Sequence, residues 1–368
     1  MVGGVLAPQS THCFSSTRDW QHRGVTPSGT ELSRSYFEHV VRPVVEAAWP
    51  RMPYAAARLG SGSDVLGLDD ETSWDHDWGL RLNLLVPADR VDAVDAHLGE
   101  HLPETFAGHP VRFPTTWDPV ARHRVQVSTA RELAVARLGV DATRDLGTDE
   151  WLSLTGQAVL EVTAGPVFVD GSGELDRIRR RLGWYPDDVW RHVVAVDWAR
   201  LAQELPFVGR AGERGDDLGS RVVAARLAAI AMHLGHLLER RWPPYAKWLG
   251  TSFGALPRAG SAAAPLGSAL EACDWQSREA GLVAALRQLN RLQGEVGLPA
   301  LDDPVEPFWD RPFHGLREAA VTVVADSVRD PAVRALPRGV GSAEQCSDNV
   351  DVLVRPALRR PPRESTGA

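Results

Sequence analysis

Lysine is almost absent from this chain of 368 residues. Lysine and arginine together number 40, and only Lys247 among them is a lysine. The abundance of Ala, Gly, Pro and Arg indicates a GC-rich genome, in which arginine stands wherever any positive charge is enough. Because lysine is a compact point charge and arginine a planar fork, the one lysine that remains is a candidate for a specific role.

Cysteine is scarce as well. The three cysteines, Cys13, Cys273 and Cys346, are too few and too scattered for a disulfide framework or a zinc site. A reducing compartment suits such a chain best, and we expect a cytoplasmic protein.

Long apolar runs and a positive net charge are missing too. No stretch approaches the roughly 20 consecutive apolar residues of a membrane span. The first residues carry no basic region followed by an apolar core, so we expect neither a membrane partner nor a secretory signal. A net charge of −8 argues against affinity for the backbone of long nucleic acids.

The most informative stretch that is present runs from residue 59 to residue 86. It opens with two Gly-Ser pairs, Gly60-Ser61 and Gly62-Ser63. Glycine lets a backbone come close to a polyphosphate, and the serine hydroxyls and backbone N–H groups are donors for it. A plain surface loop is the alternative interpretation of either pair alone.

An acid-x-acid pair, Asp75 and Asp77, follows the loop and leads into the alternating apolar positions Leu80, Leu82, Leu84 and Val86. The period of two predicts a strand over residues 74–86, so both carboxylates project from one face. Two such carboxylates repel each other unless a cation lies between them, and oxygen ligands suit Mg²⁺ carrying a substrate's phosphates. Loop and acid pair together predict a site for a nucleoside triphosphate, ATP or another, and its Mg²⁺.

This layout resembles the DNA-polymerase-beta-type nucleotidyltransferase superfamily. Its pattern is a hydrophobic residue, Gly, then Gly or Ser, a spacer of about a dozen residues, and acid-x-acid. Leu59-Gly60-Ser61 precedes Asp75 with thirteen residues between, and Gly62-Ser63 with eleven, so either pair fits. From residue 28 to 360 the chain is also similar to one bacterial family of unknown function in that superfamily, through the motifs WYPDDVW (184–190), FVGR (207–210), GDDLGSR (215–221) and PPYAKWLG (243–250).

The resemblance implies an α/β fold plus an all-α part. We expect a nucleotidyltransferase-like domain with a small mixed sheet over residues 28–147 and a helical domain over 148–340, with the active site in the cleft between them. Residues 1–27 read as a disordered tail and 341–368 as a loose C-terminal tail. Strands are predicted at 53–59, 111–113 and 123–128, and helices after Ser28 and over 91–102, 188–205 and 216–241.

A third carboxylate, which the resemblance leads one to expect on a later strand, is missing from its place. In the strand 123–128 the residue that alternates with Val125 and Val127 is Gln126, which cannot accept a proton from the attacking hydroxyl. Asp118 and Glu132 flank this strand and are possible substitutes. Asp170 is a further candidate, and a plain turn aspartate before glycine is its alternative.

The helical part contributes further candidates. Lys247 follows the rigid Pro243-Pro244 break between two aromatic residues, and the resemblance gives it a role on the triphosphate; a surface lysine kept by chance is the alternative. Arg221 and Arg226 could contact phosphate. His233 and His236 have a spacing that can hold a metal, but without a clear third ligand they fit packed or exposed histidines better.

We therefore expect a metal-dependent enzyme that moves NMP from an NTP to a hydroxyl group of a small molecule or a protein. Asp75 and Asp77 would be catalytic and hold Mg²⁺, and Gly60, Ser61, Gly62, Ser63 and Lys247 would bind the nucleotide. The alternative, favoured by Gln126, is a catalytically weakened nucleotide-binding module. A protein acceptor, as in some toxin-antitoxin systems, is a third hypothesis.

Overall fold

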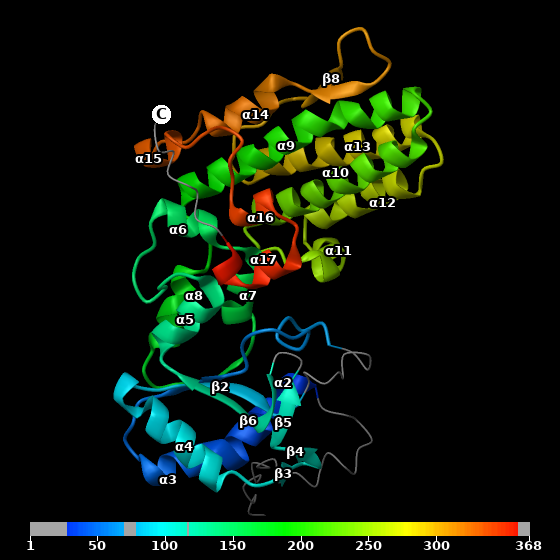
Figure 1. Ribbon diagram of the computed structural model, residues 1–368. Helices are drawn as coiled ribbons and strands as arrows, with labels where there is room; N and C mark the ends of the chain where they lie inside the picture. Colours follow the sequence, from blue (N-terminus) through cyan, green and yellow to red (C-terminus); the bar gives the residue numbers. More distant parts are fainter. Residues whose placement is uncertain (1–27, 70–78, 116–117, 360–368) are drawn as a thin grey trace, which may run out of the picture. The chain divides into compact units, whose positions relative to one another are not determined.

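The computed structural model describes residues 28–69, 79–115 and 118–359. The chain divides into two compact units (Figure 1). The first contains the described residues up to Ser128 together with Gly165–Ser172, and the second contains Thr129–Ala164 and the residues from Gly173 on. Asp75 and Asp77 lie outside the described residues, as does the expected tail at residues 1–27.

A mixed five-stranded sheet forms the centre of the first unit, with the spatial order β5-β6-β2-β1-β7. Only β2 and β6 run parallel, and the other neighbours are antiparallel. Its strands are β1 (Ala55–Ala57), β2 (Arg81–Leu85), β5 (Arg112–Thr115), β6 (Asp118–Ser128) and β7 (Val167–Asp170), and a small hairpin is made by β3 (Thr105–Phe106) and β4 (His109–Pro110). The strands β1, β2, β5 and β6 overlap the stretches predicted as strands, but β2 begins only at Arg81, and residues 74–78 of the stretch predicted over 74–86 lie outside the described residues.

Helices cover one face of this sheet. Ser28 caps the first of them, because its hydroxyl accepts the N–H of Glu31 while the Glu31 carboxylate accepts the N–H of Ser28. This helical run continues without a break as α2 (Gly29–Tyr36), η1 (Phe37–Val41) and α3 (Arg42–Ala48), and after β2 come η3 (Ala88–Arg90) and α4 (Val91–His101).

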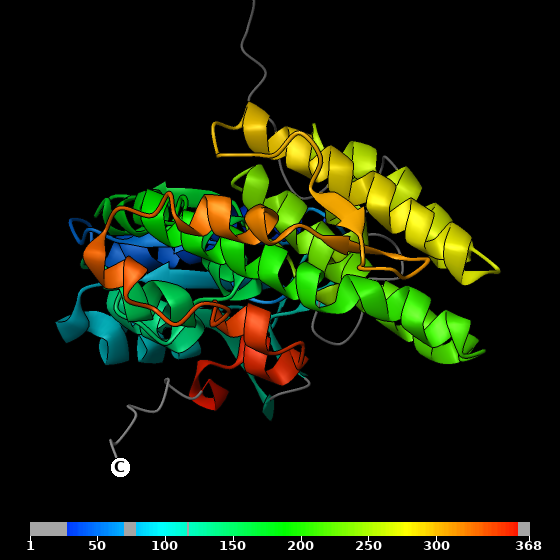
Figure 2. The ribbon, with the colours of Figure 1, turned by 90° about the horizontal axis from the view of Figure 1, so that it is seen from above.

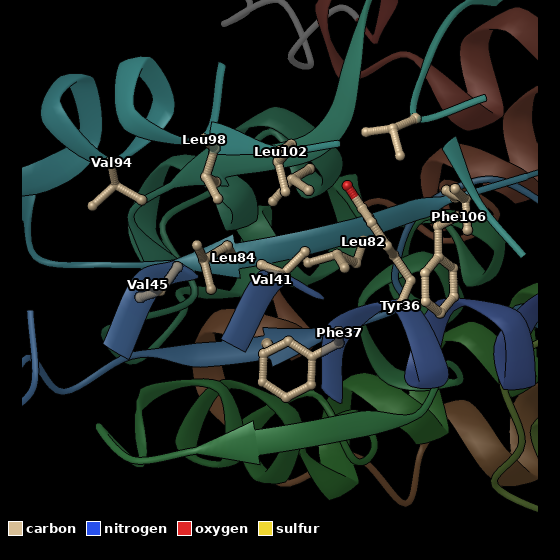
Figure 3. Close-up of a cluster of buried hydrophobic side chains, with 14 of the residues drawn as sticks. Tyr36, Phe37, Val41, Val45, Leu82, Leu84, Val94, Leu98, Leu102 and Phe106 are labelled. Atoms are coloured by element: carbon tan, nitrogen blue, oxygen red, sulfur yellow. The ribbon is translucent and has the colours of Figure 1, made fainter. Parts of the chain in front are cut away.

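The core of the first unit lies between these helices and the sheet (Figure 3). Leu82 and Leu84 of β2 point from one face of the sheet toward Phe37 and Val41 on the helical run and Leu98 on α4. All five are almost completely buried, and burying each side chain contributes roughly 1.5–3 kcal/mol. The opposite face of the sheet is therefore left for other residues, which alternate with these apolar ones.

Long helices make up most of the second unit. Figure 2 shows α9, α10, α12 and α13 side by side, and α14 packs on α9. The helices are α5 (Ala130–Leu138), α6 (Thr148–Ser153), α7 (Gly156–Thr163), α8 (Glu174–Arg181), α9 (Asp187–Glu213), α10 (Asp217–Leu238), α11 (Ala246–Gly254), η4 (Ala259–Ala262), α12 (Ala263–Glu271), α13 (Trp275–Glu295), α14 (Glu318–Ala325), α15 (Pro331–Arg334), α16 (Ala343–Cys346), α17 (Val350–Val354) and η5 (Pro356–Leu358), with a hairpin of β8 (Val305–Pro307) and β9 (His314–Leu316).

By length and composition alone, α10 would pass for a membrane span. In the structure 56% of its most apolar window is buried inside the unit. Its buried side chains, among them Leu227, Ile230, Leu234 and Leu237, are what the core helix of a helical bundle requires.

A small mixed sheet and a large set of helices are both present, as the sequence predicts. The chain passes into the second unit at Thr129, earlier than the expected boundary at 147–148, and the stretch 341–359, expected to be loose, forms α16, α17 and η5. Compactness does not show that a unit folds alone, so the domain boundaries stay predictions.

Candidate functional site

The glycine loop leaves the sheet directly after β1. Gly60 and Gly62 both have positive φ angles, 92° and 140°, which favour glycine. A Cβ atom on Gly62 would lie 2.2 Å from Oδ1 of Asp64 and 2.9 Å from Nη2 of Arg58. Glycine at 62 is therefore needed twice, for the backbone angle and for the close approach of two charged side chains.

Those two side chains, Arg58 and Asp64, form a buried ion pair that fixes the loop. Nε and Nη2 of Arg58 donate to the two carboxylate oxygens of Asp64 at 2.8 and 3.0 Å. Nη1 also donates to the carbonyl of Leu59 at 2.6 Å, and Nη2 to that of Ser61 at 3.3 Å. A bidentate pair of this kind gives geometric specificity as well as energy. No local sequence pattern indicates this ion pair, although the two residues flank both Gly-Ser pairs.

The serine side chains of the loop are open. Ser61 and Ser63 are half-buried, and neither hydroxyl makes a hydrogen bond with any residue in the described part of the chain. The carbonyl of Ser63 accepts the N–H groups of Leu66 and Leu68 at 3.1 and 2.9 Å, which closes the turn behind it. The loop thus combines a fixed backbone with hydroxyl donors that an anionic ligand can use.

A row of amide groups anchors the loop to the sheet. Oδ1 of Asn83 on β2 accepts the N–H of Leu59 at 3.0 Å, and its Nδ2 donates to Oε1 of Gln126 on β6 at 3.0 Å. Asn83 pairs with Gln126 and with Ala57 in the strand register, so these residues share one face of the sheet, opposite the apolar core. Gln126 therefore has a structural role, in which it orients the side chain that holds the loop.

Asp170 lies on the same face. It is opposite Ala55 in the register of β7 and β1, and its carboxylate accepts the hydroxyl of Ser172 at 3.1 Å. The structure thus brings the glycine loop, Asn83, Gln126 and Asp170 to one side of one sheet. Asp75 and Asp77 come shortly before β2 in the sequence, in the stretch 70–78 that is not described.

Asp118 and Glu132, the two carboxylates proposed as substitutes for the missing acid, both accept hydrogen bonds from residues close to them in the sequence. Asp118 accepts hydrogen bonds from Arg124 at 2.8 Å and from Arg122 at 2.7 Å, and these lower the pKa of Asp118 to about 2. Glu132 accepts the N–H and hydroxyl of Thr129, the residue that caps α5, and its pKa is lowered by these hydrogen bonds. Carboxylates held ionised in this way are weak bases. Asp118 and Glu132 are therefore poorly suited to act as the general base, a role that the amide of Gln126 cannot perform.

Lys247 lies in the second unit, in the first turn of α11. Its side chain is exposed, and Nζ lies 4.9 Å from the centre of the Trp248 ring, within the range of a cation–π contact. No carboxylate within the described residues pairs with it. The ammonium group is thus held by an aromatic ring and keeps its donors available.

The other basic candidates are engaged within the second unit. Arg221 pairs with Asp217 at 2.6 Å, and Arg226 makes two hydrogen bonds to Glu204. His236 is fully buried, with Nε2 2.9 Å from the hydroxyl of Ser252. Burial lowers its pKa to about 4, so the ring is neutral.

His233 belongs to a buried charge cluster that the sequence did not reveal. Its ring nitrogens lie 2.5 Å from Asp197 and 3.3 Å from Glu344. Burial alone would lower the pKa of His233, but the charges and hydrogen bonds of the two carboxylates outweigh it and raise the pKa to about 10. In the described part of the chain, no group of three or more His, Cys, Asp or Glu side chains is arranged to hold a metal ion.

Comparisons with known proteins locate a family match in the second unit. Residues 151–249 match a family described as a domain of unknown function (DUF4037). This range contains three of the motifs on which the resemblance rests and nearly all of the fourth, PPYAKWLG, whereas the glycine loop and the acid pair precede it.

Among solved structures, the chain is similar to a nucleotidyltransferase-like protein from Exiguobacterium sibiricum 255-15, with a TM-score of 0.33 and 14% identity, over 73% of this chain and 77% of that one. No curated protein gives a match. We therefore base the proposed function on the residues of this chain.

Proposed function

We propose that this chain is a metal-dependent nucleotidyltransferase that transfers NMP from an NTP to a hydroxyl group of a small molecule or a protein. The observation that carries the proposal is the glycine loop after β1. A buried ion pair and Asn83 fix its backbone, and the hydroxyls of Ser61 and Ser63 are open. Donors held rigidly in a glycine loop are what an anionic phosphate chain requires.

In this proposal Asp75 and Asp77 would hold Mg²⁺, and the metal would supply positive charge next to the reacting phosphate. Ser61 or Ser63 and the loop N–H groups bind the outer phosphates, and Lys247 supports the leaving pyrophosphate. The net charge of −8 is in keeping with a small-molecule or protein acceptor rather than a long nucleic acid.

A second candidate function is a nucleotide-binding module without turnover. The favouring observation is the set of contacts at three of the four positions considered for a general base. Gln126 accepts a hydrogen bond from Asn83, and Asp118 and Glu132 are engaged by Arg124 and Thr129. Asp170 is the candidate that favours the enzyme, because it lies on the same face of the sheet as the loop.

The test is a thermal-shift titration of the full chain with ATP, GTP, CTP and UTP, with and without Mg²⁺. We expect a saturable rise in melting temperature with one or more nucleotides, about 2.7 kcal/mol of stabilisation at a hundred times the Kd. The rise should need Mg²⁺, and Asp75→Asn and Asp77→Asn should abolish it. Asp69→Asn, which alters another aspartate shortly before the pair, is the matched control and should keep it.

The same proteins then separate the two functions. Incubation of the wild type with an α-labelled NTP and cell extract should label an acceptor and release pyrophosphate if the chain is an enzyme. Binding without labelled product would favour the module. Unchanged Mg²⁺-dependent binding in both Asp75→Asn and Asp77→Asn would contradict the site assignment.

A further inference from the structure

The second unit contains a cavity that the proposed function does not use. It has a volume of about 490 Å³ and is bounded by α9, α14 and the chain from α15 to Gly339. Sites for small organic molecules in proteins have volumes of roughly 300–1,000 Å³. The cavity is thus large enough for a ligand of several rings or a branched chain.

Small apolar side chains keep this space open. Ala195 and Ala199 are one helical turn apart on α9 and line the same wall, and Ala325 lines the α14 side. Val196 and Val321 complete the apolar surface. A lining of methyl groups and short branched chains favours an apolar body, because burial of such surface from water stabilises the complex.

One polar atom of the residues that line the cavity has no hydrogen-bond partner among the described residues. His192 lines the cavity and is 8% exposed, and its Nε2 lies 2.8 Å from the carbonyl oxygen of Val340. A carbonyl oxygen only accepts, so Nε2 carries a proton, and because burial lowers the pKa of His192 the ring is neutral. Nδ1 is then an acceptor, and no residue in the described part of the chain donates to it.

The charged groups around the cavity are already engaged by the protein. Arg338 donates to Asp326 at 3.2 Å, and the guanidinium of Arg334 donates to the carbonyl of Val328. Neither the lining nor these groups leaves a strong site for an ion. The hydroxyl of Thr322, another lining residue, makes no hydrogen bond with a described residue and is a second neutral polar group.

We propose that this cavity binds a neutral, mainly apolar small molecule whose single hydrogen-bond donor meets Nδ1 of His192. The size, the alanine-rich wall and the unpartnered acceptor each select one property of the ligand. A ligand that covers Nδ1 without donating to it removes the acceptor from water unpaired, which costs about 1–3 kcal/mol, so a ligand that supplies the donor binds more tightly than one that only fills the space. The site belongs to the second unit and does not depend on the nucleotide site.

A matched pair of probes tests this. Indole has one N–H donor, and 1-methylindole has nearly the same shape without it. We expect saturable binding of indole to the full-length protein by ligand-observed NMR, with 1-methylindole roughly tenfold weaker. The ¹⁵N resonance of His192 Nδ1, observed in histidine-labelled protein, should shift with indole at the same concentration dependence.

Variants that fill the cavity locate the binding. Ala199→Leu and Ala325→Leu place extra methyl groups on opposite walls, and each should reduce indole affinity at least tenfold. Ala225→Leu, at an exposed position of α10, adds the same bulk outside the cavity and should bind like the wild type. Thermal melts show which variants fold. One folded variant of the two that fill the cavity is enough to test where indole binds.

Three results would overturn the proposal. The first is no saturable indole binding to the wild type, and the second is indole binding that neither folded filling variant weakens. The third is equal affinity for indole and 1-methylindole, which would reject the role of His192 and with it the stated ligand class. If Asp75→Asn loses NTP binding and still binds indole, the indole site is independent of the nucleotide site.

Discussion

Gly62 is the residue on which the shape of the glycine loop depends most directly. Its φ of 140° is a conformation that side chains rarely adopt, and a Cβ would collide with Asp64. We expect Gly62→Ala to lower the free energy of unfolding by about 3 kcal/mol, because it strains the backbone and disturbs the buried pair of Arg58 and Asp64. Urea unfolding followed by circular dichroism measures this change.

Gly67→Ala is the control for this substitution. Gly67 lies in the same loop with a positive φ of 69°, but nothing lies within 4 Å of its Cβ position. Gly67→Ala should therefore lower the free energy of unfolding only through backbone strain, by about 1 kcal/mol. Equal losses in the two variants would show that the contact with Asp64 and Arg58 does not matter.

The charge of His233 should make the free energy of unfolding depend on pH in the neutral to alkaline range. Its folded pKa of about 10 lies above the ordinary value of 6.5, so the stabilisation is fully present below pH 6.5 and is lost as pH rises toward 10. The difference in unfolding free energy between wild type and His233→Gln should shrink over this range, by up to about 1.4 kcal/mol per pH unit. Urea unfolding at pH 6, 8 and 9.5 measures it, and a constant difference would show that His233 is not charged.

His236, one turn further along α10, predicts the opposite dependence. Burial lowers its pKa to about 4, so the unfolded chain binds a proton below pH 6.5 that the folded chain does not. The advantage of the wild type over His236→Gln should be present above pH 6.5 and decrease as pH falls toward 4. Unfolding series at pH 7, 6 and 5 measure this, and a difference that grows on acidification would contradict a neutral ring.

At the scale of elements, the C-terminal segment 342–359 is held by buried polar contacts. Nε2 of Gln345 donates to Asp197 at 2.8 Å, and Glu344 accepts the N–H of Gly156 at 2.7 Å. The hydroxyl of Thr155 donates to the carbonyl of Leu353 at 2.7 Å. Removing the segment would leave Asp197 and His233 buried without two of their neighbours.

A chain that ends at Gly341 should therefore be less stable than the full chain by several kcal/mol, because uncompensated buried charge costs about 3–5 kcal/mol. A chain that ends at Arg359 is the control and keeps every contact described for the segment. Urea unfolding of the three proteins gives the comparison. If the shortest chain unfolds at the same urea concentration as the other two, residues 342–359 are the loose tail that the sequence suggested.

The long elements of the fold could be predicted from sequence, and the short ones could not. Alternating Leu82 and Leu84 indicated β2, and recurring apolar residues such as Leu227 and Leu234 indicated α10. The helices α16 and α17 have four and five residues. Helices so short have no stability of their own, because nucleation is unfavourable. Their existence depends on tertiary contacts such as those of Gln345.

The candidate site was predictable to a similar degree. The Gly-Ser pairs marked the loop, because their chemistry lies in local sequence. The buried pair of Arg58 and Asp64 was missed, since charged residues are by default expected at the surface. The links from Asn83 to Leu59 and Gln126 depend on strand register. The cavity beside His192 depends on how helices distant in sequence pack, which no local pattern encodes.

At the scale of the whole molecule, our proposal gives a role on the nucleotide to the single lysine of the chain. Gly60 to Ser63 belong to the first unit and Lys247 to the second. All the other residues counted as lysine or arginine in the chain are arginines. A compact ammonium group is able to contact a phosphate oxygen where a planar guanidinium does not fit, so replacement by arginine is not conservative here.

Lys247→Arg and Lys247→Ala therefore test the proposal for the molecule as a whole. If Lys247 binds the outer phosphates, both variants should bind Mg²⁺-ATP roughly tenfold more weakly, because a charge-assisted hydrogen bond is lost. The affinity for AMP should stay almost unchanged. Calorimetric titration measures both affinities, and Arg214→Ala, an exposed cation at the end of α9, is the control. If Lys247 only covers Trp248, ATP and AMP affinities will stay at the wild-type level, because a contact of Nζ with the ring involves no phosphate. The nucleotide site would then be confined to the loop and acid pair of the first unit.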